Sequence, residues 1–240
     1  MPTQQNRLLA VSSPLGEDVL LLRSIHVEEE LGRLFEFNLE LYSEKSDISL
    51  SDILGQNLTV RLTLEGQETR FFNGYCSEFT QTGAFGRYSA YRATLRPWLW
   101  FLTRTSDCRI FQQKTVPDIV KEVLREHGFD NFEDSLNGSY RSWENCVQYR
   151  ETDFDFVSRL MEQEGIYYFF KHENGKHALV LCDSDSAHQP YSGYAKVPFF
   201  PPGENVIRDR DYWHGWSMTQ CIQPGAMALN DFDFKKPKAS

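Results

Sequence analysis

Residues 146–170 read CVQYRETDFDFVSRLMEQEGIYYFF and predict an extended segment, a capped helix and a strand in direct succession. Thr152, with Asp155 three residues later, comes close to a capping box, which starts a helix by satisfying its first free N–H groups. Gly165 stands where a residue in the left-handed conformation ends such a helix. Residues 166–170 are five β-formers in a row and predict a strand. A helix that ends on one glycine and becomes an aromatic strand is expected to be a rigid joint, which is typical of a scaffold and not of a pocket.

The predicted helix is amphipathic. Phe154, Val157 and Met161 recur every three to four positions, and Phe156 and Leu160 stand beside them. This stripe is wide enough to bury one face of the helix.

The composition of the 240 residues allows one large β-rich domain or two smaller ones. Hydrophobic residues make up 40% and aromatic residues 14% of the chain, which is enough for a sizeable core. The net charge is −9 and no stretch is strongly basic. This balance argues against nucleic acid as a partner, because neutralising phosphates needs a basic face.

The cysteines and the N-terminus bear on the compartment. Five cysteines are spread through the chain without CxxC spacing, at Cys76, Cys108, Cys146, Cys182 and Cys221. That spacing indicates neither a zinc site nor a disulfide framework, so free, buried thiols in a reduced compartment are expected. Residues 1–11 lack the features of a secretory signal, and no window approaches the roughly 20 apolar residues that span a bilayer. The chain is therefore predicted to be made in the cytoplasm, without stable membrane insertion.

Alternation of apolar and polar residues marks the first part of the chain. In residues 34–41 and 58–64 every second residue is apolar, which predicts strands with one buried and one solvated face. Turn signals at 65–67 and 83–86 join three strands into an antiparallel meander. Gly74 interrupts the middle strand and is predicted to mark a bulge.

These patterns predict an α+β fold that is mostly antiparallel β. Residues 1–97 are predicted to form a first β-barrel-like domain, closed or nearly closed. Residues 98–165 are predicted to be an α-rich insertion, in which 129–145 connect a helix ending at His127-Gly128 to the capped helix. Residues 166–240 are predicted to be part of a second β-barrel-like domain.

Residues 183–188 offer two weak sites. Asp183-Ser184-Asp185-Ser186 resembles the start of a calcium loop but lacks its turn glycine and its final glutamate. Ser184, Asp185 and His188 could be written as a triad, but triad residues converge from separate segments, and no GxSxG motif surrounds the serine. A solvated surface loop explains both patterns more simply.

Other candidate side chains have equally simple explanations. His172 and His177 bracket an Asn-Gly hairpin turn and are expected to face each other, but two histidines are a weak metal signal. Carboxylates suited to glycoside hydrolysis are more simply charges on the solvated helix face, and tryptophans suited to sugar stacking are more often core or subunit contacts. These side chains are Asp153, Asp155, Glu162 and Glu164, and Trp98, Trp100, Trp213 and Trp216. No catalytic, cofactor-binding or metal-ligating residue is assigned.

Two long runs carry a family resemblance. Residues 95–112 (LRPWLWFLTRTSDCRIFQ) and 148–170 (QYRETDFDFVSRLMEQEGIYYFF) closely resemble VgrG proteins, which form the trimeric tip of the type VI secretion system. Residues 31–37 (LGRLFEF) and 229–234 (LNDFDF) are similar to the same family. The resemblance covers nearly the whole chain, and runs of this length are highly specific.

The resemblance implies a phage tail hub fold, with two β-barrel-like domains and an α-rich insertion in each chain. Three chains would form a homotrimer, a ring of six barrels that can sit on the hexameric Hcp tube. The implied function is that of a structural hub, which caps the tube and carries the spike and effectors or adaptors into a target cell. It implies no enzyme, no cofactor and no metal.

The resemblance also implies export by the type VI apparatus to the extracellular space or the target cell, without a signal peptide. VgrG chains continue through the rest of the second barrel, an OB-fold and a β-helical spike. This sequence shows none of these and is expected to be the N-terminal portion of a hub. The alternatives are a contractile-phage tail hub or baseplate protein, an effector- or adaptor-binding module, and a cell-wall hydrolase.

Overall fold

The computed structural model describes residues 3–64, 69–190, 194, 196–201, 212–226 and 228. The chain divides into two compact units, residues 1–189 and 190–240, and each is described by itself. Within the described ranges, no helix is both long and apolar enough to cross a membrane.

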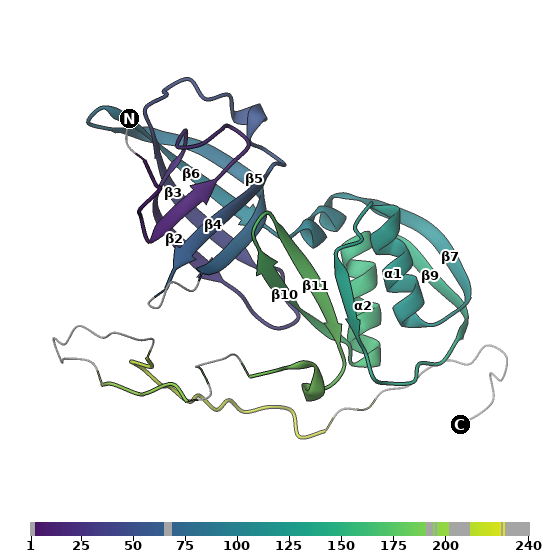
Figure 1. Cartoon of the computed structure of the whole chain (residues 1–240). Helices are drawn as coiled ribbons and strands as arrows, with labels where there is room; N and C mark the ends of the chain where they lie inside the picture. The colour runs from purple at the N-terminus through teal and green to yellow at the C-terminus, as the bar shows by residue number, and fades with distance from the viewer. Residues whose placement is uncertain are drawn as a thin grey trace, which may run out of the picture. The chain divides into compact units, whose positions relative to one another are not determined.

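The first unit opens with a six-stranded antiparallel sheet that curls into a half-barrel (Figure 1). Its strand order is β1-β4-β5-β6-β3-β2. The predicted meander is confirmed, since β4, β5 and β6 are neighbours in the sheet. The strands are β1 (Leu9–Ser12), β2 (Leu21–Glu28), β3 (Glu36–Ser43), β4 (Asn57–Thr63), β5 (Thr69–Phe85) and β6 (Tyr88–Arg96), with a short 3-10 helix η1 (Leu50–Asp52) before β4.

The inner face of the half-barrel is apolar because alternate residues of each strand point inward. Along β3, every second side chain is buried, as the alternation in 34–41 predicts. Phe37 and Leu39 of that strand are fully buried and meet Val60 and Leu95 from the strands beside and across from it. Burial of this face against itself is what holds the sheet in its curled form.

Gly74 does not mark a bulge, so that prediction is wrong. It pairs in register with Leu58, and the irregularities of β5 come later, between Cys76 and Glu78 and between Gln81 and Gly83. Glycine is favoured at 74 for a different reason, the close approach of its neighbours. A Cβ there would lie 3.0 Å from the Leu95 Cβ and 3.2 Å from both the Arg96 carbonyl oxygen and the Phe35 ring.

The two ends of the sheet are joined by a side chain instead of a strand ladder. β1 and β2 end the strand order, and the buried Gln4 amide lies between them. Its Oε1 accepts from the N–H groups of Val11 in β1 and Leu22 in β2, each at 3.0 Å. Its Nε2 donates to the Val11 carbonyl at 3.2 Å and to the Leu20 carbonyl at 2.9 Å. The two edge strands of the half-barrel are therefore linked at this seam by one glutamine.

The rest of the first unit is a smaller lobe of two helices, a three-stranded sheet and a two-stranded ribbon (Figure 1). The sheet has the order β10-β11-β8, with β8 parallel to β11, and the ribbon pairs β7 with β9. The elements are η3 (Trp98–Arg104), β7 (Ser106–Lys114), α1 (Val116–Glu126), β8 (Phe132–Ser135), β9 (Trp143–Thr152), α2 (Asp153–Glu164), β10 (Tyr167–Glu173), β11 (Lys176–Cys182) and η4 (Asp185–Ala187).

Two features of this lobe differ from the sequence expectations. The expected connector 129–145 contains β8 and the start of β9, and β8 forms because distant β11 offers it a partner. The expected domain boundary after residue 165 would separate β8 from its partner strand β11. β10 and β11 also share a core with the helices, so they join the expected insertion in one folded lobe.

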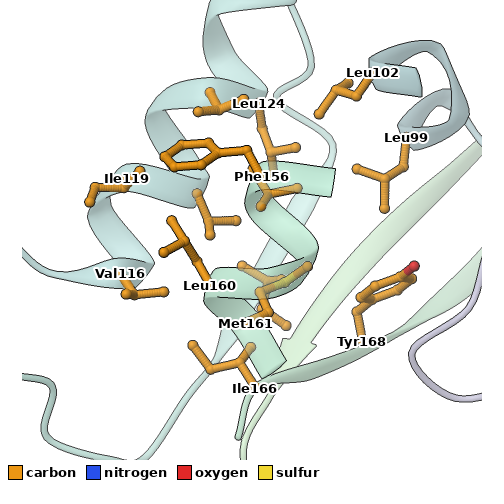
Figure 2. Close-up of a cluster of buried hydrophobic side chains, with 14 of the residues drawn as sticks. Leu99, Leu102, Val116, Ile119, Leu124, Phe156, Leu160, Met161, Ile166 and Tyr168 are labelled. Carbon is orange, nitrogen blue, oxygen red and sulfur yellow. The ribbon is translucent and has the colours of Figure 1, made fainter. Parts of the chain in front are cut away.

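The core of the lobe is built where α1, α2 and η3 meet (Figure 2). The side chains of Phe156 and Leu160 on α2 lie against Ile119 and Leu124 on α1, as the predicted apolar stripe requires. Tyr168 from β10 closes one side of this core and is 3% exposed. The helix and the strand that follow each other at Gly165 are thus packed into the same cluster.

Both ends of α2 are as predicted. The Thr152 Oγ1 accepts from the Asp155 N–H at 3.0 Å and donates to the Asp155 carboxylate at 2.7 Å. Gly165 has φ 71°, and its N–H is directed at the carbonyls of the last turn. The Ile166 N–H donates to the Met161 carbonyl at 2.8 Å, which completes the stop.

Replacing Gly165 by alanine is expected to lower the free energy of unfolding by about 1 kcal/mol. An added Cβ meets nothing within 4 Å, so the cost comes from the left-handed backbone alone. Asparagine tolerates this conformation better, and Gly165→Asn should cost less than Gly165→Ala. Urea unfolding measures both variants, and an alanine variant as stable as the wild type would contradict the expectation.

The second unit has little regular structure among its described residues. Phe199 and Trp213 form an isolated parallel bridge. The Trp213 N–H donates to the Pro198 carbonyl, and the Phe200 N–H to the Trp213 carbonyl, each at 2.8 Å. Much of the segment expected to belong to the second barrel, including 202–211 and 229–240, lies outside the described residues.

Candidate functional site

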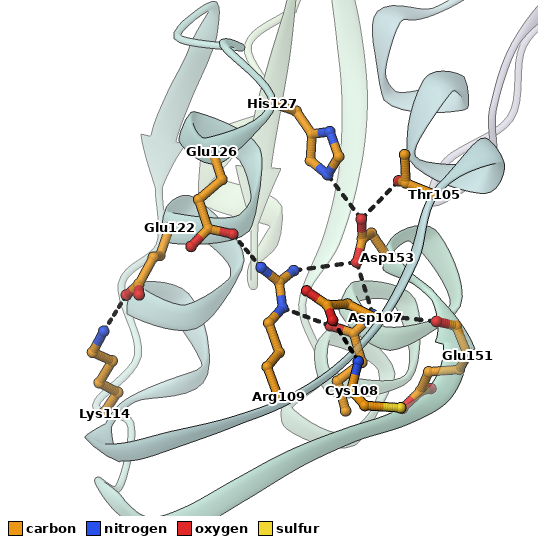
Figure 3. A network of polar contacts seen from close by, with 11 residues as sticks. Thr105, Asp107, Cys108, Arg109, Lys114, Glu122, Glu126, His127, Glu151 and Asp153 are labelled. Atoms are coloured by element: carbon orange, nitrogen blue, oxygen red, sulfur yellow. Dashed lines mark hydrogen bonds and ion pairs between the residues drawn. The ribbon is translucent and has the colours of Figure 1, made fainter.

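The first polar cluster of the lobe is centred on the carboxylate of Asp153, the first residue of α2 (Figure 3). Its Oδ1 accepts from the Gln148 Nε2 at 2.7 Å and from the Arg109 guanidinium at 3.2 Å. Its Oδ2 accepts from the Thr105 hydroxyl at 2.7 Å and lies 2.8 Å from the His127 Nε2. Four elements or their ends therefore meet at one carboxylate: η3, β7, α1 and β9.

Asp153 was expected on the solvated face of its helix, and that expectation is wrong. The residue is 4% exposed, whereas Asp155 and Glu162 do face solvent. Burial raises the pKa of Asp153, but the hydrogen bonds from Gln148, Thr105 and His127 and the charge of Arg109 outweigh it and hold the pKa below its usual range. The carboxylate stays ionised because its donors replace water.

The geometry at Asp153 is that of a structural anchor. Both Thr105 and His127 bond to the carboxylate itself, so no histidine stands between a nucleophile and an acid as acyl-transfer chemistry requires. Arg109 continues the cluster to Gln148 at 2.8 Å and to Glu126 on α1. The result is a network of satisfied charges that ties the ribbon to both helices.

The second polar cluster lies where the β10–β11 hairpin meets the half-barrel. His172 and His177 are direct cross-strand partners, with ring centroids 5.9 Å apart, so the expectation that they face each other is confirmed. On the half-barrel side, Asn73 of β5 contacts both histidines and is fully buried. Its N–H donates to the His172 Nδ1 at 3.1 Å, and its Oδ1 lies 2.8 Å from the His177 Nδ1.

Hydrogen-bond roles in this second cluster fix the state of His177. Its Nε2 accepts from the Trp98 N–H at 3.0 Å, so that nitrogen carries no proton. The Asn73 Nδ2 is engaged with Thr59 at 2.7 Å, so its Oδ1 is the acceptor for the His177 Nδ1–H. Burial, together with the neighbouring His172, lowers the pKa of His177 to about 3. His177 is thus a neutral structural ring.

Residues 183–188 form neither the calcium loop nor the triad considered above. They are hydrogen-bonded to residues 137–140 and to Tyr167. The Asp183 carboxylate accepts from the N–H groups of Asn137 and Gly138 and from the Tyr140 hydroxyl, at 2.6–3.0 Å. The His188 Nε2 lies 2.8 Å from the Tyr167 hydroxyl, while the Ser184 hydroxyl bonds to Ser186 and Asn137. Across the described residues, no group of three or more metal-ligating side chains is placed to hold an ion.

The tryptophans do not gather into a sugar-binding platform within the first unit. Trp98 is 1% exposed and stacks on Phe129, with ring centroids 4.6 Å apart. Trp100 lies beside it in η3 and carries the Arg104 guanidinium over its ring. In the second unit Trp213 and Trp216 are exposed and meet edge to face at 6.1 Å.

The outer face of the β7–β9 ribbon carries an apolar stretch, beside the polar pair Gln112 and Asn145. Ile110 and Val147 are cross-strand partners, as are Cys108 and Tyr149. All four lie on the face of the ribbon opposite to the buried Phe111. Ile110 and Tyr149 are each more than 60% exposed. Cys108 is exposed as well, as is Cys221 in the second unit, so the expectation of buried thiols is wrong for these two and holds for Cys76, Cys146 and Cys182.

Comparison with known proteins identifies a family and several similar proteins. Residues 28–240 match the family described as phage tail baseplate hub (GPD). Over 236 residues the chain is 52% identical to the type VI secretion system spike protein VgrG1a of Pseudomonas aeruginosa, and the match covers 98% of this chain and 36% of that protein. The chain thus spans about a third of the length of this curated relative.

Solved structures agree on the fold. An E. coli component of the type VI secretion system, described as similar to the T4 bacteriophage tail proteins gp27 and gp5, superposes with a TM-score of 0.63 at 25% identity, covering 76% of this chain and 52% of that one. A Francisella PdpA–VgrG complex gives 0.51 at 15% identity, covering 73% and 31%. The chain therefore belongs to the phage tail baseplate hub (GPD) family, and its high-identity relatives are the VgrG spike proteins of the type VI secretion system.

Proposed function

We propose that this chain is the hub portion of a type VI spike, which docks on the hexameric Hcp tube and carries the spike with its effectors into a target cell. The observation that carries the proposal is the 52% identity to VgrG1a over 98% of this chain. Because the chain spans about a third of that relative, the activity and partners of the whole spike are extended to it as part of the proposal.

The internal contacts suit a part that transmits force. The lobe is tied to the half-barrel by the buried Asn73 cluster, and its helices are tied to the ribbon through Asp153. Satisfied buried polar networks have one preferred geometry, and a close-packed core yields little under load. Both properties favour a mechanical role over one that needs a deformable pocket.

The domain organisation is also part of the proposal. Residues 1–97 would be the first barrel of the hub, and 98–165 with the β10–β11 hairpin would be the inserted lobe. The pairing of β8 with β11 supports extending the lobe to Cys182. The second barrel of the hub would then be built from residues that follow this strand.

Light scattering coupled to size-exclusion chromatography tests docking and assembly. We expect this chain, extended by the spike region of the P. aeruginosa relative, to be a homotrimer that co-elutes with Hcp rings. The spike region alone is the matched control, and we expect it to trimerise without retaining Hcp. An extended protein that is trimeric but leaves Hcp in its own peak would overturn the docking proposal.

We further propose that the chain has no enzymatic activity, since the matched family is a structural one. The hydrolase alternative needs a catalytic carboxylate, and among the candidate side chains Asp153 is the buried one whose pKa is held below its usual range. We expect peptidoglycan turnover by the chain to stay at the level of buffer. Turnover that disappears in Asp153→Asn, in protein shown by circular dichroism to be folded, would establish the enzyme instead.

A further inference from the structure

The junction between the hairpin and the half-barrel depends on imidazole nitrogens acting as acceptors. The His172 Nδ1 receives the Asn73 N–H at 3.1 Å, and the His177 Nε2 receives the Trp98 N–H at 3.0 Å. At the hairpin tip, the Gly175 N–H donates to the Thr59 hydroxyl of β4 at 3.2 Å. Three backbone N–H groups therefore report directly on whether this junction is closed.

His177 is enclosed by aromatic rings on the remaining sides. The centroids of the Phe35, Phe170, Tyr75 and Trp98 rings lie 5.3–6.5 Å from its own. The residue is 1% exposed. Water therefore cannot solvate a charge on this ring while the junction is closed.

The charged groups near His177 do not compensate a proton on it. From β10, His172 faces it and adds repulsion when charged. Glu29, from the loop after β2, bonds to His172 at 3.0 Å and lies 3.9 Å from Arg70 of β5. In the contacts made by the described residues, His177 bonds to an amide oxygen and a backbone N–H and to no carboxylate.

Protonation of His177 would break the junction at a defined atom. A proton on Nε2 turns the acceptor of the Trp98 N–H into a second donor, so two N–H groups would point at each other. The ring regains hydration only if the hairpin moves away from β5 and η3. We propose that His177 makes this junction an acid-sensitive latch, in which proton uptake in mildly acidic solution releases the β10–β11 hairpin from the half-barrel.

The direction of the pH effect follows from linkage. A freed histidine has a pKa near 6.5, whereas the pKa of His177 in the closed junction is about 3. Between these values the open form binds one more proton than the closed form. The opening equilibrium therefore rises as the pH falls below about 6.5, with a slope that approaches tenfold for each pH unit, and the closed form is fully favoured above that pH.

Hydrogen exchange on the full chain tests the latch without reference to secretion. The N–H groups of Asn73, Trp98 and Gly175 are followed between pH 6.5 and 4.5 and corrected for intrinsic exchange. We expect their opening to increase about fiftyfold over this range, because the freed ring is already half protonated at pH 6.5. The Ile166 N–H, bonded inside the lobe, is the internal reference and should not change with the same slope.

Variants separate the latch from general acid sensitivity. His177→Gln offers a side-chain oxygen to the Trp98 N–H and cannot titrate, so its slope should be flat. His188→Gln changes an exposed histidine and should keep the wild-type slope. A flat wild-type slope, or an equal slope in folded His177→Gln, would overturn the proposal. If His177→Gln does not fold, the wild-type protein still provides the test. The pH slope of exchange at the three junction N–H groups is then compared with the slope at the Ile166 N–H, and equal slopes would contradict a local latch.

Discussion

Replacing Asp153 by alanine is expected to lower the free energy of unfolding by about 3–5 kcal/mol, among the largest single effects in the chain. The variant removes the acceptor of four donors and takes from the largely buried Arg109 guanidinium one of its two carboxylate partners, the buried one, so that only the half-exposed Glu126 remains. Removing one partner of a buried charge cluster costs more than the cluster contributes, because the remaining charge is not rehydrated. Urea unfolding followed by tryptophan fluorescence measures the loss.

Asp155 provides a matched control two residues away on the same helix. Its carboxylate is exposed and serves only the Thr152 cap, so Asp155→Ala should cost about 1 kcal/mol or less. Asp153→Asn keeps the shape but loses the charge, and it should fall between the two alanine variants. Equal losses for Asp153→Ala and Asp155→Ala would show that the cluster adds nothing beyond helix capping.

The acid dependence of this effect has a definite sign. Because the pKa of Asp153 is held below its usual range, its contribution is present above about pH 3.9 and disappears as the pH falls through the lowered pKa. The difference between wild type and Asp153→Asn should therefore be constant from pH 7 to 5. It should shrink only below about pH 4.

The elements that local signals specify could be predicted from sequence. Helix α2 carries a side-chain cap at Thr152, a glycine at its left-handed end and an apolar stripe between them, and all three act within a few residues. The β10–β11 hairpin could also be predicted from sequence, because its turn needs a residue with positive φ and Gly175 supplies it with φ 80°. In these segments the backbone and the nearest neighbours decide the conformation.

Elements that exist through distant partners could not be predicted. Residues Phe132–Ser135 have no strong β signal and become β8 because β11 offers a parallel edge more than 40 residues later. Asn73 is buried because the hairpin covers the face of β5 that alternation would leave in water. Neither fact is contained in a local window.

One signal for the Asp153 cluster was present in the sequence. In β9, Gln148 shares its strand face with buried Cys146, so alternation places an amide on the buried side. A polar side chain on the buried face of a strand needs hydrogen-bond partners. The pattern therefore predicts a buried hydrogen-bond network but does not identify its other residues. Arg109 lies directly opposite Gln148 in β7, so a second polar side chain falls on the same face of the ribbon.

Replacing Gln4 by alanine is expected to lower the free energy of unfolding by about 3 kcal/mol. The variant leaves the N–H groups of Val11 and Leu22 and the carbonyls of Val11 and Leu20 without their partner at the seam of the half-barrel. Each unsatisfied buried group costs about 1–3 kcal/mol, and water entering the space left by the side chain recovers part of that sum. Urea unfolding gives the total, and hydrogen exchange at Val11 and Leu22 locates it.

Two further variants distinguish hydrogen bonding from packing at this seam. Gln4→Met fills a similar volume with no donor or acceptor and should be nearly as destabilised as Gln4→Ala, because the lost bonds dominate. Gln5→Ala changes the exposed neighbour and should stay within about 0.5 kcal/mol of the wild type. A stable Gln4→Met with unchanged exchange at Val11 and Leu22 would show that β1 and β2 hold together without this side chain. In that case the curled sheet would owe its closure to its apolar face alone.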